Sequence, residues 1–157
     1  MKKESKIMSA GRKILKMILI TMTVLWVLFI FYNSLADGIE SAELSGGLLQ
    51  KINELIESSG IILSEHLLRK TAHFVEFSIL GALLMSSMLV SVKGAIGNNI
   101  FIPLFCGLLT AVSDESIQLF SDGRSGQVSD VMLDFGGVLF GIGCIYVIRC
   151  VIKMKGK

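Results

Sequence analysis

Four long apolar segments constrain this chain more than any other feature. They cover residues 14–32, 71–92, 100–120 and 131–152. A helix needs about 20 apolar residues to cross ~30 Å of hydrocarbon, where its backbone polar groups must be satisfied internally. Because 52% of the 157 residues are hydrophobic and only 18% are charged, a water-soluble domain could not cover its apolar surface. We therefore predict an all-α, polytopic membrane protein with four transmembrane helices, forming a single domain over residues 1–157.

Lysine and arginine residues are distributed unevenly around these segments. Of the 15 in the chain, all but four precede or begin the first segment, follow or end the last one, or lie in the turn after the second. The four exceptions are Lys51, Arg69, Lys70 and Arg124. Because cytoplasmic loops are enriched in Lys and Arg, we expect both termini to be cytoplasmic. A signal peptide cleaved after Ala36 is the alternative, but the first apolar run is longer than a usual signal core.

The loop between the first two segments, residues 33–68, is the longest in the chain. Within it, Leu48, Leu49, Ile52, Leu55 and Ile56 recur at helical spacing. This pattern predicts a short amphipathic helix. The helix would lie on the outer membrane surface or pack over the helix bundle.

Charged and polar side chains gather at the predicted outer ends of three segments. In a helix, Arg69, His73 and Glu76 share one face. Asp114 and Gln118 lie one turn apart in the third segment, and Asp130 and Asp134 lie one turn apart at the start of the fourth. The candidate site residues are Arg69, Lys70, His73, Glu76, Asp114, Glu115, Gln118, Arg124, Asp130 and Asp134.

The lengths of the apolar runs place six of these residues at a similar depth, namely His73, Glu76, Asp114, Glu115, Gln118 and Asp134. The run from Ile100 to Val112 covers only ~20 Å at ~1.5 Å per residue, about 10 Å less than the hydrocarbon thickness. The runs that follow Glu76 and Asp134 cover ~24 Å and ~21 Å by the same rise. A charge at the centre of a membrane helix costs about 2.5–3.5 kcal/mol on insertion scales. We therefore expect the charged groups to face one another in one polar site.

Several of these residues also have a purely structural interpretation. His73 is typical of a hydrogen-bonded structural histidine, and Asp130 suits a helix N-terminus. Arg124 is typical of a turn between glycines. The spacing Gly137-x-x-x-Gly141 is typical of a helix-packing face.

Two stretches of the chain carry a recognisable pattern. They read RKTAHFVEFSILGALL and SDESIQLFSDGRSGQVSDVMLDFGGVLFG. The pattern resembles that of the VanZ-like family of bacterial membrane proteins, in which R-K-x-x-H-F-x-E, D-E-x-x-Q-x-F, G-R-x-x-x-x-x-D and D-x-x-x-N-x-x-G-x-x-x-G follow in this order. The resemblance covers most of residues 67–143. Asp134 stands where the family usually has Asn, and Phe77 where Tyr is common.

The resemblance implies a multi-pass protein of the bacterial cytoplasmic membrane that acts in the cell envelope. The family name comes from a protein linked to low-level resistance to the glycopeptide teicoplanin, so the resemblance also implies a contribution to antibiotic resistance. It implies no particular reaction.

Three functions fit the candidate residues. The first is binding of an anionic lipid or lipid-linked cell-wall precursor through Arg69, Lys70, Gln118, Arg124, Asp130 and Asp134, because Arg suits phosphate. The second is an intramembrane enzyme with His73, Glu76, Asp114 and Glu115 as acid/base groups. The third is a metal-dependent enzyme, because His-x-x-Glu with acids from other helices suits a hard metal.

The sequence contains no G-x-S-x-G nucleophile motif, phosphate loop or Cys/His zinc cluster. It therefore assigns no cofactor and no metal ligand, and it leaves open whether the protein is an enzyme. We expect a membrane lipid as partner and no nucleic acid. The sequence does not determine the oligomeric state.

Overall fold

The computed structural model describes residues 2–35, 64–92, 99–120 and 127–155. Within these residues it contains helices and no strands, which confirms the all-α prediction. The helices are α1 (Lys2–Leu35), α3 (Glu65–Ser91), α4 (Phe101–Gln118) and α5 (Val128–Lys155). The predicted amphipathic helix and Arg124 lie outside the described residues.

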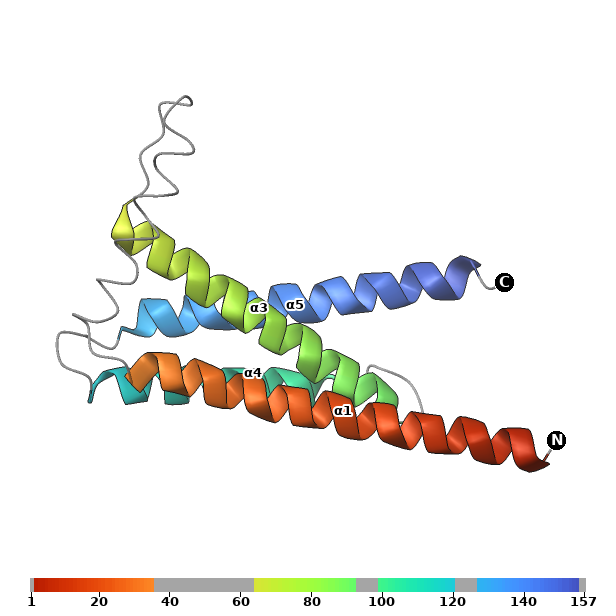
Figure 1. Cartoon of the computed structure of the whole chain (residues 1–157). Helices are drawn as coiled ribbons and strands as arrows, with labels where there is room; N and C mark the ends of the chain where they lie inside the picture. The colour runs from red at the N-terminus through yellow and green to blue at the C-terminus, as the bar shows by residue number, and fades with distance from the viewer. Residues whose placement is uncertain (1, 36–63, 93–98, 121–126, 156–157) are drawn as a thin grey trace, which may run out of the picture.

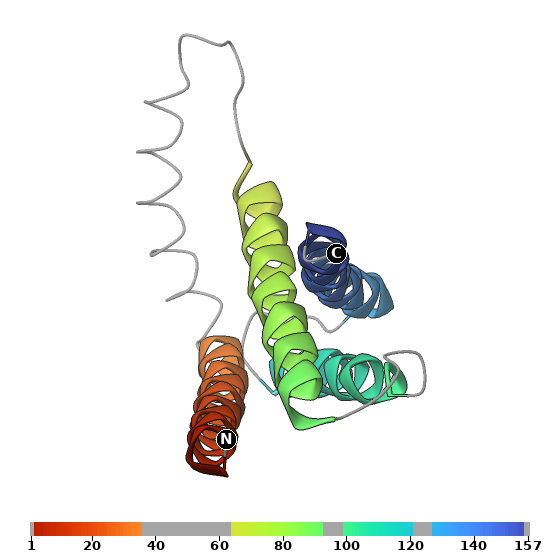
Figure 2. The same ribbon diagram turned by 90° about the vertical axis from the view of Figure 1, so that its right-hand side faces the viewer.

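Successive helices run in opposite directions, so the start of α1 and the end of α5 lie at the same end of the bundle (Figure 1). The opposite end contains the last turns of α1 and α4 and the first turns of α3 and α5. We call this opposite end the polar end, because the candidate site residues lie there. Helices α3 and α4 each contact the three other helices that the structure describes, and α3 crosses the middle of the bundle in Figure 2.

Three helical segments are long and apolar enough to cross a membrane, namely Ala10–Leu35, His66–Ser91 and Val128–Lys155. Helix α4 has 18 residues and spans only about 27 Å at about 1.5 Å per residue. Its last turns contain Asp114, Glu115 and Gln118, which lower its hydropathy. Four spans therefore stay a prediction, and three are supported by length and composition.

Helices α1, α3 and α5 are longer than the apolar segments that predicted them, whereas α4, at 18 residues, is shorter than the predicted segment 100–120. Helix α3 begins at Glu65, six residues before the predicted start, because Ser64 caps it by accepting a hydrogen bond from the Leu67 backbone N–H at 3.2 Å. Hydropathy marks the hydrocarbon-embedded part of a helix, whereas backbone hydrogen bonds continue into the polar flanks. The first turns of α3 therefore bring Arg69 and Lys70 into the helix.

Large apolar side chains are exposed on every helix. Examples are Leu25 on α1, Val75 on α3, Phe105 on α4 and Ile152 on α5. Soluble monomers rarely expose contiguous apolar surface on this scale, so these faces fit contact with lipid. The buried apolar cluster is Ile30, Phe77, Leu80, Met85, Met88, Ala111, Val138 and Ile142.

Glycines allow the backbones of α3 and α5 to touch. A Cβ atom added at Gly141 would collide with the backbone oxygen of Ser78. One at Gly137 would lie 2.6 Å from the backbone oxygen of Phe74. This confirms that Gly137-x-x-x-Gly141 is a helix-packing face. The close contact fixes α5 against α3 directly beside the polar end.

Candidate functional site

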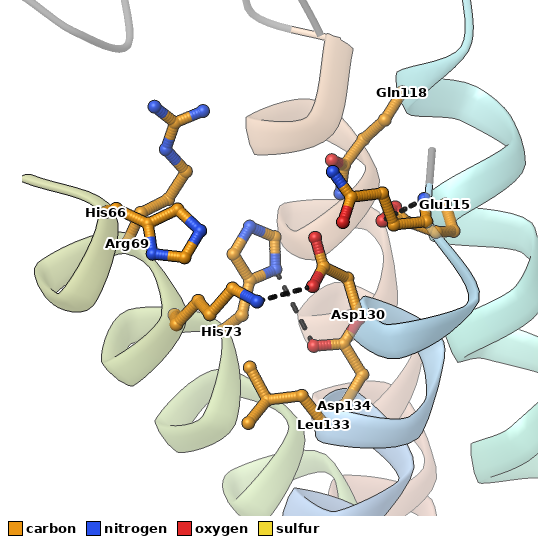
Figure 3. A pocket seen from close by; sticks show the side chains of 10 residues that line it. His66, Arg69, His73, Glu115, Gln118, Asp130, Leu133 and Asp134 are labelled. Carbon is orange, nitrogen blue, oxygen red and sulfur yellow. Dashed lines mark hydrogen bonds and ion pairs between the residues drawn. The ribbon is translucent and has the colours of Figure 1, made fainter. Parts of the chain in front are cut away.

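A cavity of about 150 Å³ lies at the polar end between α3, α4 and α5 (Figure 3). Its position follows from the antiparallel order of the helices, which brings the polar ends of all three to one level. The residues that line it are His66, Arg69, Lys70, His73, Glu115, Gln118, Gln127, Asp130, Leu133 and Asp134. Seven of the ten sequence-predicted site residues therefore meet around one cavity.

Helix α3 supplies the basic side of the cavity. His66, Arg69, Lys70 and His73 lie in its first turns. The spacing of three and four residues keeps His66, Arg69 and His73 on one face of the helix. In Figure 3 the His73 ring points from α3 toward the α5 carboxylates.

Two buried carboxylates lie deepest in the site. Asp114 on α4 is 0% exposed and Asp134 on α5 is 1% exposed. The His73 Nδ1 atom lies 3.9 Å from Asp114 Oδ2 and 3.9 Å from Asp134 Oδ1. The three side chains come from three different helices, so the bundle itself assembles this group.

Hydrogen bonds hold the Asp114 carboxylate in place. Ser34 donates its hydroxyl to Asp114 Oδ1 at 2.5 Å, and the Gln118 Nε2 amide donates to Asp114 Oδ2 at 2.9 Å. Asp134 is held differently. Its Oδ1 atom is buried and has no hydrogen-bond partner among the described residues.

Weaker polar contacts surround the cavity closer to solvent. Lys70 Nζ lies 2.9 Å from Asp130 Oδ1, and both side chains are about one-third exposed. The Gln127 backbone N–H donates to Glu115 Oε1 at 3.3 Å. The ion pair joins α3 to α5, and the hydrogen bond joins the chain just before α5 to α4.

Glu76 is placed away from this cavity. It lines a second cavity of about 380 Å³ together with apolar side chains such as Phe29 and Val75. Its Oε1 atom accepts a hydrogen bond from Asn33 Nδ2 at 3.1 Å, and its backbone oxygen accepts one from Trp26 Nε1 at 2.9 Å. The shared helical face predicted for His73 and Glu76 is therefore divided, because the side of α3 that carries Glu76 packs against α1.

Sequence reasoning missed four polar residues at this end of the bundle. His66 and Gln127 line the first cavity, and Asn33 and Ser34 bond to two of the predicted carboxylates. His66 was detectable because it extends the stripe of Arg69 and His73 by one turn. Asn33 and Ser34 were detectable as polar residues at the end of the first apolar segment, at the same level as the acids.

The fold and the site together define a class, a helical membrane protein with buried ionisable groups collected at one end of its bundle. The sequence profile of the VanZ/LLP1 family matches residues 19–149, and the chain belongs to this family. The match includes every residue that lines the first cavity. The resemblance drawn from the sequence motifs is confirmed. No curated protein and no solved structure matches the chain.

Proposed function

We propose that this protein binds the anionic headgroup of a membrane lipid or of a lipid-linked cell-wall precursor at the polar end. The observation that supports this most is the basic side of the cavity, formed by Arg69 and Lys70 with His66 and His73. Arg69 is four residues inside α3, so it lies about 6 Å from the helix start at about 1.5 Å per residue. Because Arg69 just precedes the apolar segment at residues 71–92, we expect it to lie near the level of the lipid headgroups. A guanidinium matches a phosphate in both charge and geometry.

The cavity size limits which part of the ligand it takes. Ligand pockets that enclose a drug-sized molecule measure about 300–1,000 Å³. The cavity measures about 150 Å³, which suits a phosphate-sized group and not a complete sugar-peptide precursor. The acyl or isoprenoid chain would run along the apolar outer faces of the helices, and the rest of the headgroup would stay in water.

The polar end should face the outside of the bacterial cytoplasmic membrane. Arg12, Lys13, Lys16, Arg149 and Lys153 lie toward the opposite end of the bundle, and cytoplasmic ends are enriched in such residues. We expect an impermeant thiol reagent to label a Gln127→Cys variant in intact cells and not a Lys155→Cys variant. The opposite labelling pattern would place the cavity in the inner leaflet.

Native mass spectrometry of the protein in mild detergent tests headgroup binding. Replacing Arg69 and Lys70 with Gln should weaken the binding of an anionic lipid at least about tenfold, since hydrogen bonds to charged groups contribute about 1.5–3 kcal/mol each. The matched control replaces Lys153 and Lys155, which removes the same charge at the far end. Equal retention of lipid in both double variants would exclude the proposal. If the ligand is a cell-wall precursor, the Arg69/Lys70 variant should also lower teicoplanin tolerance.

Acid/base catalysis on the bound headgroup is a second candidate function. The supporting observation is the position of His73, whose Nδ1 faces two buried carboxylates while its ring borders the cavity. A carboxylate beside one imidazole nitrogen fixes the tautomer and prepares the ring for proton transfer. A catalyst would change the mass of the bound lipid over time, and His73→Gln would stop that change while the lipid still binds. A lipid mass that stays constant in the wild-type protein argues for binding alone.

A further inference from the structure

The deepest part of the site contains a ligand set that headgroup binding does not explain. His73, Asp114 and Asp134 each offer one donor atom, and these three atoms lie within 4.8 Å of one another. They come from α3, α4 and α5, and no two are neighbours in sequence. One imidazole nitrogen and two carboxylate oxygens therefore converge on one point.

Lys70, the nearby lysine, does not pair with either Asp114 or Asp134. Asp114 and Asp134 are both buried, whereas Lys70 pairs with the more exposed Asp130 at 2.9 Å. Buried carboxylates are expensive unless a cation or several hydrogen bonds compensate them. Asp114 receives hydrogen bonds from Ser34 and Gln118. Asp134 Oδ1 has none among the described residues, although it is aimed at the same point.

We propose that His73, Asp114 and Asp134 bind one divalent transition-metal ion beneath the headgroup cavity. A mixed nitrogen and oxygen set of three protein ligands fits Zn²⁺ or Mn²⁺ better than Mg²⁺ or Ca²⁺, which favour oxygen alone. The site leaves further coordination positions for water or a ligand oxygen, because His73 and Asp134 also line the cavity.

The donor atoms, which lie within 4.8 Å of one another, must move closer together to accommodate an ion. Tetrahedral zinc with nitrogen and oxygen ligands at about 2.0–2.2 Å separates its donor atoms by about 3.4 Å. The His73 Nδ1 atom is 3.9 Å from a carboxylate oxygen on either side. The hydrogen bonds that Ser34 and Gln118 make to Asp114 orient this ligand, as outer partners commonly do in metal sites.

The ion would also reduce the electrostatic repulsion between the cavity carboxylates and an anionic headgroup. Glu115, Asp130 and Asp134 line the same space as Arg69 and Lys70, so the acids oppose entry of an anionic headgroup. A divalent ion between Asp114 and Asp134 would neutralise the two deepest carboxylates and attract a phosphate oxygen. The metal site itself does not depend on the proposed headgroup binding.

Metal binding is best tested with the metal alone. Detergent-purified protein, first treated with a chelator, is titrated with Mn²⁺ followed by electron paramagnetic resonance, and with Zn²⁺ followed by calorimetry. We expect one ion per chain. Asp134→Asn keeps the side-chain shape and removes its charge, so it should weaken binding at least about tenfold.

The matched control is Glu76→Gln, which removes a carboxylate three residues from His73 on the same helix. Because Glu76 lines the other cavity, metal affinity should change less than about threefold in this variant. Equal loss in both variants, or full retention in Asp134→Asn, would overturn the proposed ligand set.

A measurement on the wild-type protein covers the case in which Asp134→Asn fails to fold. A ligand that binds only the folded state raises the Tm, so Zn²⁺ or Mn²⁺ should raise the Tm of the wild-type protein and equimolar Mg²⁺ should raise it less. Absence of both a Tm shift and a stoichiometric titration excludes the site. If the Arg69/Lys70 variant loses its bound lipid and still binds metal, the metal site is independent of headgroup binding.

Discussion

The face of α5 that packs on α3 differs sharply between its two halves. Toward the polar end it presents Asp130 and Asp134, and within one turn it changes to Gly137 and Gly141. The glycine half lets the two backbones touch, while the carboxylate half borders the cavity and meets α3 only through side chains, with Asp130 near Lys70 and Asp134 near His73. We infer from this contrast that the glycine contact fixes α5 against α3. The side chains of Asp130 and Asp134 then keep their distance from α3 although the backbones do not touch there.

The largest expected effect comes from breaking the glycine contact. Gly141→Ala places a methyl group against the Ser78 backbone oxygen, which cannot move away like a flexible side chain. Overpacking a tight core typically costs about 1–3 kcal/mol, and a backbone clash belongs at the upper end of this range or above it. Thermal unfolding in detergent should show a strongly lowered Tm, and the polar end should lose its ligands with the fold.

Gly143→Ala is the matched control for that prediction. Gly143 lies two residues further along α5, where a Cβ atom would meet nothing within 4 Å. Alanine also has a higher helix propensity than glycine by roughly 1 kcal/mol. The control should therefore keep or slightly raise the Tm. A similar loss in both variants would mean that the two backbones do not touch at Gly141.

A smaller loss of stability is expected from removing one hydrogen bond at the polar end. Ser34→Ala removes the hydroxyl that donates to Asp114 Oδ1 and leaves that buried oxygen with one fewer donor. Losing such a partner costs about 1–3 kcal/mol. The Tm should fall moderately, and any metal affinity should fall with it because Asp114 is less well oriented.

Ser116→Ala, also a hydroxyl deletion, provides the comparison for Ser34→Ala. Ser116 is an exposed residue on α4 whose hydroxyl donates to the Val112 backbone oxygen of its own helix. Its loss should change the free energy of unfolding by less than about 0.5 kcal/mol and leave the Tm nearly unchanged. If Ser34→Ala were equally mild, α1 would not contribute to holding the buried carboxylate.

Much of the fold was predictable because the bilayer restricts the choices. Apolar runs of span length must be helical in lipid, and the structure contains helices over all four predicted segments. The common level of the polar residues followed from counting residues along each helix. Hydropathy could not give the helix ends, since Ser64 and its cap lie outside the apolar run.

The candidate site was predictable as a set of residues and not as a set of contacts. The sequence itself predicted that His73, Asp114 and Asp134 lie at a similar depth, because that depth was counted from the rise along each helix. Periodicity also fixes which residues share a face within one helix. It contains no information about how far each helix is rotated toward its neighbours.

Only the tertiary structure decided which of these groups meet. The packing of α1 against α3 turned Glu76 toward Asn33, and the position of α4 brought Asp114 to Ser34, 80 residues away in the chain. The close α3–α5 contact brought Asp134 within reach of His73. The physical reason is that helix rotation and separation are set by side-chain volume at the interfaces, here the missing side chains of Gly137 and Gly141, and not by the periodicity of any single helix.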